Sequence, residues 1–190
     1  VEGSSCETAI ALPINDGEGV TGVIDVPGKA DYYMMDVLAG QFLMLFTDAN
    51  PEDNPELIDT VISLYSEDGA SLIATDDDAF PRVSTDSELV YHVASDGKIC
   101  LKLEEFSSWY GAEAEGSEDF TYSLFAYTLD DEADATNHDL EPNDDLGNAQ
   151  EAGFASLEYG SSAYFYGLLD PETDVDGYAF TVPEGGAGMN

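Results

Sequence analysis

The side chains that could carry out acid–base or nucleophilic chemistry form no recognisable catalytic set in this sequence. The histidines are His92, inside the alternating segment YHVA, and His138, inside an acidic segment. Serines are plentiful, but no Gly-x-Ser-x-Gly elbow occurs, and carboxylate pairs are too frequent to single out a glycosidase-type pair. Catalysis requires a nucleophile, a base and an orienting group that converge. We therefore expect a protein that is not an enzyme.

The charge balance excludes two further classes of function. The chain of 190 residues has 41 Asp and Glu against 4 Lys and Arg, a formal net charge of −37, while 43% of its residues are hydrophobic. Such a surface repels phosphate backbones and anionic headgroups, and no apolar stretch is long enough to span a bilayer. Nucleic acids and direct membrane insertion are therefore excluded. The acids require screening by salt or by divalent cations, as in an extracellular medium.

Cys6 and Cys100 are the two cysteines of the chain. Cys100 lies in the alternating segment KICLKL, and no Cys-x-x-Cys pair indicates zinc or redox chemistry. We predict a Cys6–Cys100 disulfide, which suits a secreted protein and would tie the amino-terminal segment to a late strand of the first domain. The alternative is a pair of buried free thiols.

Short segments of alternating, β-branched or aromatic residues recur along the first two thirds of the chain. Clusters of Gly, Asp, Asn and Pro separate them, and SEDGAS between two of them predicts a hairpin. This spacing predicts an all-β chain, an antiparallel β-sandwich of jelly-roll-like form. No helix of ten residues or more is expected, and residues 107–119 are expected to form one long surface loop.

Four aspartates flank the two strands of the predicted hairpin. Asp59 precedes the first strand, and Asp76, Asp77 and Asp78 follow the second, so pairing of the strands would bring them to one edge of the sheet. They are a weaker candidate for a metal site. A solvated turn is the favoured alternative, because consecutive strand residues point to opposite faces.

One phrase of the sequence is written twice. GVIDVPGKADYYMMDVLAG (22–40) aligns without a gap with GLLDPETDVDGYAFTVPEG (167–185), at an offset of 145 residues. An acidic segment without strand periodicity lies between the copies. We therefore expect a complete β-sandwich at residues 1–128, an acidic linker at 129–145 and the truncated start of a second repeat at 146–190.

The first copy resembles the bacterial pre-peptidase C-terminal domain, a β-sandwich module of secreted peptidases and large surface proteins. The resemblance covers residues 6–127 and rests on GVIDVPGKADYYMMDVLAGQFLML, DTVISLYSEDGASLIATDDD and the alternating strand after Asp96-Gly97. The segment LEPNDDLGNAQEA (140–152) is similar to the usual opening of the same family. The resemblance implies a non-catalytic spacer or targeting module, extracellular or at the cell surface, joined to neighbouring domains of a longer chain.

The resemblance also implies a calcium site, because some members of the family, including collagen-binding domains of secreted collagenases, bind Ca²⁺ near their amino-terminal segment. Ca²⁺ takes about six to eight oxygen ligands. A solvated acidic linker is the alternative. In the first copy Lys29 stands where an acid stands in the second, and a cation repels a cation, so we expect no equivalent site there. Carried over by position, the ligands of the second copy are Glu141, Asn143, Asp144, Asp174 and Asp176.

Trp109 and Tyr110 are candidates for ligand binding of another kind. They lie in the predicted loop 107–119, and exposed aromatic side chains suit sugar rings or a peptide surface. The alternative function is therefore a carbohydrate- or protein-binding module, similar to collagen-binding domains, with an extracellular protein or polysaccharide as partner. The competing interpretation is that Trp109 packs back against the edge of the sandwich.

Overall fold

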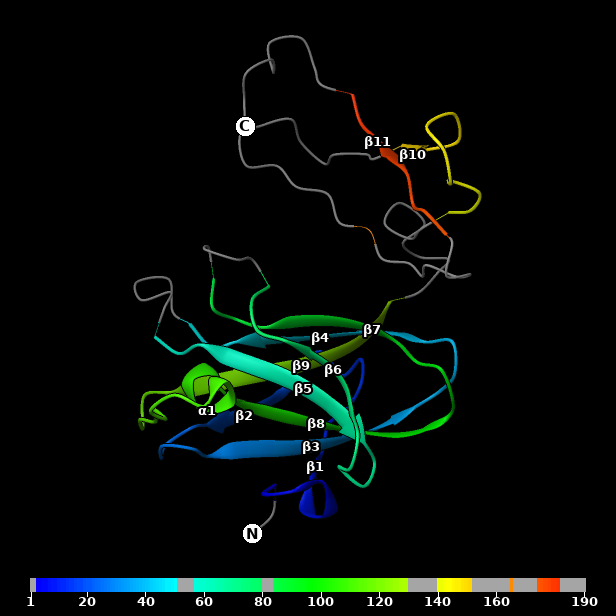
Figure 1. Ribbon diagram of the computed structural model, residues 1–190. Helices are drawn as coiled ribbons and strands as arrows, with labels where there is room; N and C mark the ends of the chain where they lie inside the picture. Colours follow the sequence, from blue (N-terminus) through cyan, green and yellow to red (C-terminus); the bar gives the residue numbers. More distant parts are fainter. Residues whose placement is uncertain are drawn as a thin grey trace. The chain divides into compact units, whose positions relative to one another are not determined.

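The computed structural model describes residues 3–50, 57–79, 84–129, 140–151, 165 and 174–181. It divides the chain into two compact units, Val1–Leu129 and Asp130–Asn190 (Figure 1). Within the described residues, no helix is long and apolar enough to cross a membrane.

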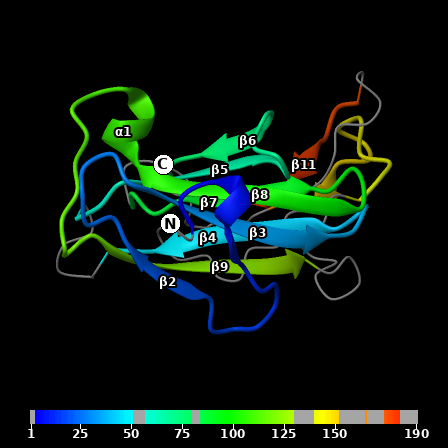
Figure 2. The same ribbon diagram turned by 90° about the horizontal axis from the view of Figure 1, so that it is seen from below.

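Two β-sheets form the first unit (Figure 1, Figure 2). Its strands are β1 (Ile10–Ala11), β2 (Val20–Val23), β3 (Ala30–Val37), β4 (Phe42–Asp48), β5 (Thr60–Ser66), β6 (Leu72–Asp76), β7 (Glu88–His92), β8 (Gly97–Glu105) and β9 (Thr121–Leu129). One sheet has the order β1-β3-β8-β5-β6 and the other β2-β9-β4-β7. All pairings are antiparallel except that of β1 with β3. The predicted antiparallel β-sandwich is thereby confirmed.

The core lies between the two sheets, because alternate residues of each strand point inward. Leu45 of β4 and Leu124 of β9 are fully buried, and they belong to the same apolar cluster as Leu101 and Leu103 of β8 in the other sheet. Burying one such side chain contributes about 1.5–3 kcal/mol. This core fixes the sheet edges and loops that carry the candidate sites.

The predicted disulfide is present between Cys6 and Cys100. Cys6 lies in the short 3-10 helix η1 (Cys6–Thr8), and Cys100 lies in β8, the central strand of the five-stranded sheet. Both cysteines of the chain are used, and no free thiol remains. The bond ties the opening segment of the first unit to the middle of its sheet.

The prediction that residues 107–119 form one long loop is wrong at its start. A short helix, α1 (Phe106–Tyr110), precedes the loop. The Glu105 carboxylate caps the helix by accepting hydrogen bonds from two of its N–H groups, and Gly111 ends it with φ of 79°. A helix of one turn shows no periodicity, so the sequence pattern could not reveal it.

The described part of the second unit begins in the same way as the first. Strand β10 (Gln150–Glu151) pairs in parallel with β11 (Tyr178–Ala179), as β1 pairs in parallel with β3. Gln150 is opposite Tyr178, and Ile10 is opposite Tyr33. Tyr33 and Tyr178 are equivalent positions of the recurring phrase. The same short ladder therefore stands at the same place in both copies.

Candidate cation sites

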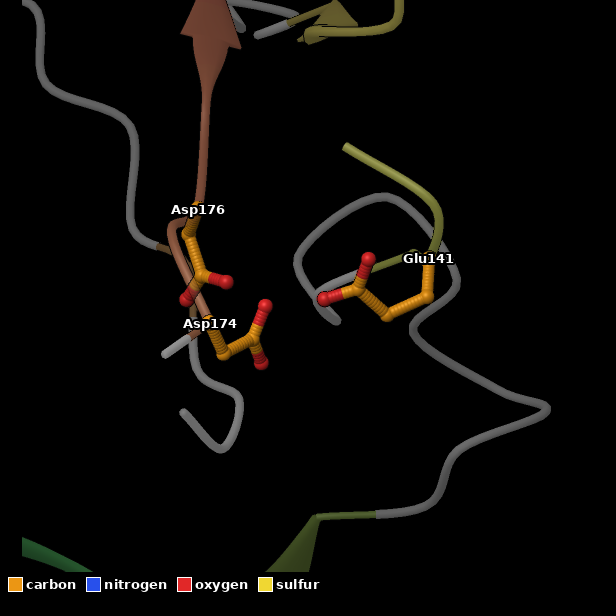
Figure 3. A group of neighbouring side chains, drawn as sticks. All are labelled: Glu141, Asp174 and Asp176. Atoms are coloured by element: carbon orange, nitrogen blue, oxygen red, sulfur yellow. The ribbon is translucent and has the colours of Figure 1, made fainter. Parts of the chain in front are cut away.

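Three carboxylates of the second unit converge: Glu141, Asp174 and Asp176 (Figure 3). Each offers one oxygen, and these oxygens all lie within 4.8 Å of one another. Asp174 and Asp176 are half-buried and stand on the segment that leads into β11, whereas the exposed Glu141 reaches toward them from the opening segment. We call these three side chains the acidic triad.

Hydrogen bonds hold the two segments of the acidic triad together. The fully buried Asn143 accepts the N–H of Gly177 on its Oδ1 at 3.0 Å. The N–H of Asn143 in turn donates to the Glu141 carboxylate at 2.9 Å. A Cβ at Gly177 would lie 2.7 Å from the carbonyl oxygen of Asn143, so the close approach requires glycine. The opening segment is therefore clamped beside the strand that carries the two aspartates.

The predicted ligand set is thus brought together in part. Glu141, Asp174 and Asp176 meet, and Asn143 fixes the opening segment beside them. Asp144 is exposed and lies outside the acidic triad. Binding of calcium by these residues stays a prediction.

The sequence of the second unit supplies many acids and almost no basic side chains. Residues 130–190 contain neither Lys nor Arg, and His138 is their one histidine. At an effective dielectric constant of about 20, two like charges about 4 Å apart repel by roughly 4 kcal/mol. Three carboxylates held this close therefore favour a bound cation. Their oxygen ligands suit a hard divalent ion.

The second group of predicted acids gathers at one edge of the first unit. Strands β5 and β6 form the predicted antiparallel hairpin through the turn SEDGAS. Burial raises the pKa of Asp59 to about 7, and the charges of Asp78, Asp77 and Glu105 add to the shift. Burial likewise raises the pKa of Asp76. The charges of these aspartates therefore interact, as expected if the hairpin brings them to one edge of the sheet.

Glu105 is a member of this edge that the sequence analysis missed. It is 4% exposed, and its carboxylate accepts the N–H groups of Ser107, Ser108 and Glu115 at 2.7, 3.2 and 3.4 Å. Those donors satisfy Glu105. Asp59 is different, because its Oδ1 is buried and has no hydrogen-bond partner among the described residues. Ionisation of Asp59 is therefore less well compensated than that of Glu105.

Replacing Asp59 by asparagine is expected to stabilise the protein at pH 8. A raised pKa in the folded state means that ionising Asp59 opposes folding, so the penalty is full above pH 7 and absent below the unfolded pKa of 3.8. Allowing for partial solvent screening, we expect a gain of about 1–2 kcal/mol at pH 8 and almost none at pH 4. Urea unfolding with a chelator present measures both values.

Asp68→Asn is the matched control for that experiment. Asp68 lies in the turn of the same hairpin, and the hydrogen bond from Ser66 lowers its pKa. Its replacement should not stabilise the protein at pH 8. An Asp59→Asn effect of the same size at both pH values would contradict the assignment.

Trp109 and Tyr110 lie on α1 and remain accessible. Trp109 is 41% exposed and Tyr110 72% exposed. The ring of Phe106 lies 5.6 Å from each of their rings and is stacked on that of Tyr110 at 10°. Trp109 is therefore held in place by a neighbour without being covered. The three rings form an aromatic platform on the surface of the first unit.

Another aromatic surface was not foreseen. Phe46 of β4 stacks with Phe125 and Tyr127 of β9, with ring centroids 5.0 and 6.0 Å apart. All three are half-buried, whereas their neighbours Leu45 and Leu124 belong to the core, so the stacked rings lie on the outer face of the sheet. The signal was present in FLMLFT and SLFAYT, where both sets of alternate positions are apolar.

Comparison with known proteins yields distant likenesses alone. No family model matches the chain, and no curated protein matches it. Among solved structures, the pre-peptidase C-terminal domain of a collagenase from Bacillus anthracis is 18% identical, with a TM-score of 0.43 over 62% of this chain and 93% of that one. A periplasmic inhibitor of g-type lysozyme from Aeromonas hydrophila is 13% identical, with a TM-score of 0.43 over 64% and 96% of the chains. The corresponding inhibitor from Salmonella Typhimurium is 15% identical, with a TM-score of 0.36 over 64% and 97%. Likenesses this distant carry no conclusion about function.

Proposed function

We propose that this chain is a non-catalytic module of a secreted or cell-surface protein and that calcium stabilises its second unit. The observation that carries the proposal is the acidic triad, three carboxylates held together in a unit without Lys or Arg. The disulfide and the excess of acids suit an oxidising medium rich in divalent cations. The resemblance of the sequence to pre-peptidase C-terminal domains supports the same role.

Calcium is the cation that suits the acidic triad best. The three residues offer carboxylate oxygens alone, with no histidine or cysteine among them, which disfavours zinc and copper. Ca²⁺ accepts irregular sets of about six to eight oxygens, whereas Mg²⁺ demands a regular octahedron. Backbone carbonyls and water would complete the shell. The triad therefore supplies the charged part of a calcium site.

Such a site would give the module a mechanical use. Glu141 lies near the end of the acidic linker, while Asp174 and Asp176 lead into β11. A cation shared by these segments would fasten the start of the second unit to its own strand. The linker would then be anchored at its end, which suits a spacer or targeting module between neighbouring domains.

Isothermal titration with calcium tests this function. The chain should bind one ion, and Asp174→Ala/Asp176→Ala should weaken binding at least about a hundredfold, because two charged ligands are lost. Asp144→Ala removes the exposed acid that directly follows Asn143 and serves as the control. No binding at millimolar calcium, or equal binding by the double variant, would refute the proposal.

A second candidate function is binding of an extracellular protein or polysaccharide, and the aromatic platform on α1 favours it. The exposed ring of Tyr110 stacks on Phe106, and large exposed aromatic rings supply much contact area to a partner. Trp109 is the sole tryptophan, so its fluorescence reports on the platform directly.

Acrylamide is expected to quench the fluorescence of Trp109 strongly. Trp109 is 41% exposed, so collisions with the quencher are not blocked. A partner that binds the platform should protect Trp109, and Tyr110→Ala should reduce that protection. Weak quenching of the free protein would remove this candidate.

A further inference from the structure

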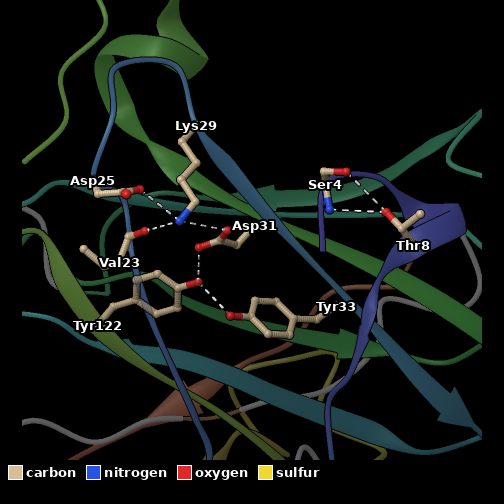
Figure 4. A network of polar contacts seen from close by, with 8 residues as sticks. All are labelled: Ser4, Thr8, Val23, Asp25, Lys29, Asp31, Tyr33 and Tyr122. Carbon is tan, nitrogen blue, oxygen red and sulfur yellow. Dashed lines mark hydrogen bonds and ion pairs between the residues drawn. The ribbon is translucent and has the colours of Figure 1, made fainter. Parts of the chain in front are cut away.

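The ammonium of Lys29 lies inside a cluster of oxygens in the first unit (Figure 4). It donates to the carbonyl oxygen of Val23 at 2.5 Å, and it lies 3.1 Å from the Asp25 carboxylate and 3.5 Å from that of Asp31. The Lys29 side chain is 31% exposed and that of Asp31 16%. The hydrogen bond from Lys29 lowers the pKa of Asp25. We call the three oxygen-bearing groups around the ammonium, the Val23 carbonyl and the carboxylates of Asp25 and Asp31, the lysine cage.

Lys29 and one carboxylate of the lysine cage occupy the positions that two members of the acidic triad occupy in the other copy of the recurring phrase. The ungapped offset of 145 residues places Lys29 on Asp174 and Asp31 on Asp176. The first unit therefore has an ammonium at the position where the second unit has the carboxylate of Asp174.

The opening segments are equivalent as well. The N–H of Tyr32 donates to the carbonyl oxygen of Gly3 at 2.9 Å, and the N–H of Gly177 donates to Asn143 Oδ1 at 3.0 Å. Tyr32 and Gly177 are equivalent at the same offset. In both units the backbone N–H of the residue that follows Asp31 or Asp176 thus binds the opening segment. The two units therefore match in the opening segment as well as in the recurring phrase.

A buried network holds Asp31 in place behind the ammonium. The Tyr122 hydroxyl donates to Asp31 Oδ2 at 2.7 Å, and the hydroxyls of Tyr33 and Tyr122 lie 2.7 Å apart (Figure 4). Burial raises the pKa of Tyr122, so its hydroxyl stays a donor. The Asp31 carboxylate is therefore preorganised around a cation.

We infer that the lysine cage is the counterpart, in the first unit, of the divalent-cation site of the second, and that the ammonium of Lys29 takes the place of the metal ion. Replacing Lys29 should therefore open a metal site. The inference rests on the proposed calcium site of the second unit. Two carboxylates and a carbonyl remain when Lys29 is replaced, and a carboxylate at position 29 restores the charge of the acidic triad. The first unit then needs no calcium, whereas the second does.

The disulfide is a further difference between the opening segments of the two units. The N–H of Thr8 donates to the carbonyl oxygen of Ser5 at 3.0 Å, and Asn148 makes the same turn with Asp145 at 3.0 Å. The residue after Ser5 is Cys6, whereas the residue after Asp145 is Leu146, which is 97% exposed. A covalent bond therefore fastens the first opening segment, whereas the second opening segment contains no cysteine.

Terbium binding to Lys29→Asp tests the inference. All variants are made in the full chain with Asp174→Ala/Asp176→Ala, so the second unit does not contribute. Tyr122, in contact with Asp31, should sensitise terbium emission at the opened site. The matched control is Lys98→Asp, the same charge change at a lysine that lies 4.0 Å from one exposed carboxylate, that of Asp36.

Lys29→Asp should give saturable emission that calcium displaces, with at least tenfold tighter binding than Lys98→Asp. Lys29→Gln should give a smaller gain of the same kind. Equal titrations of all three variants would overturn the inference, and so would a Lys29→Asp chain that stays unfolded at millimolar calcium. Titration of the unaltered chain with calcium judges the second-unit site separately, so either proposal can fail without the other.

Discussion

Replacing Cys6 and Cys100 by alanine is expected to lower the free energy of unfolding of the first unit by about 4 kcal/mol. The bond closes a loop with a sequence separation of 94 residues. In the chain-entropy model, closing so long a loop removes about 4–5 kcal/mol of unfolded-state freedom. The loss is large because the loop is long: the bond joins η1, at the start of the first unit, to β8.

Thermal unfolding followed by circular dichroism measures this effect. A loss of that size should lower the melting temperature by roughly 10–20 °C for a domain of this length. Cys6→Ala alone should cost nearly as much as the double replacement, because either change breaks the same bond. A double variant that melts within about 2 °C of the unaltered protein would show that the bond does not stabilise the fold.

Gly22→Ala is expected to be the second large effect. A Cβ at Gly22 would lie 2.2 Å from the Tyr122 hydroxyl oxygen, and Tyr122 is 3% exposed, so its ring cannot swing into solvent. The ring must shift and lose its hydrogen bonds to Asp31 and Tyr33. Overpacking and lost hydrogen bonds together should cost about 2–4 kcal/mol.

A double-mutant cycle separates this clash from other effects of the alanine. In a Tyr122→Leu background the hydroxyl and ring are gone, so Gly22→Ala should cost far less than in the unaltered protein. Gly17→Ala is the control, because its Cβ meets nothing within 4 Å and its cost comes from its φ of 76° alone. Strict additivity of Gly22→Ala and Tyr122→Leu would contradict the predicted contact.

The sheets, the hairpin and the disulfide could be predicted because they follow from local patterns. Alternation identifies a strand, SEDGAS identifies the turn between β5 and β6, and two cysteines leave one intramolecular pairing. Alternation could not show which face of a strand meets the core when both faces are apolar. For that reason the stacked rings of Phe46, Phe125 and Tyr127 were missed.

The environment of Lys29 shows another limit of the sequence. Position 29 alone indicates a cation that would repel a metal ion. That the ammonium is itself surrounded by oxygens of Val23, Asp25 and Asp31 depends on the turn between β2 and β3. The candidates Glu141 and Asp174 are 33 positions apart. Their meeting depends on the parallel ladder of β10 and β11, which no local pattern predicts.

Amide hydrogen exchange with and without calcium tests the central claim most directly. The N–H groups of Gly177 and Gln150 hold the opening segment to its strand, donating to Asn143 Oδ1 at 3.0 Å and to the carbonyl oxygen of Gly177 at 2.8 Å. Calcium on the acidic triad should slow exchange at both amides, while Tyr32, the equivalent donor in the first unit, should be unaffected. Exchange at Gly177 and Gln150 that is the same with and without millimolar calcium would contradict the account.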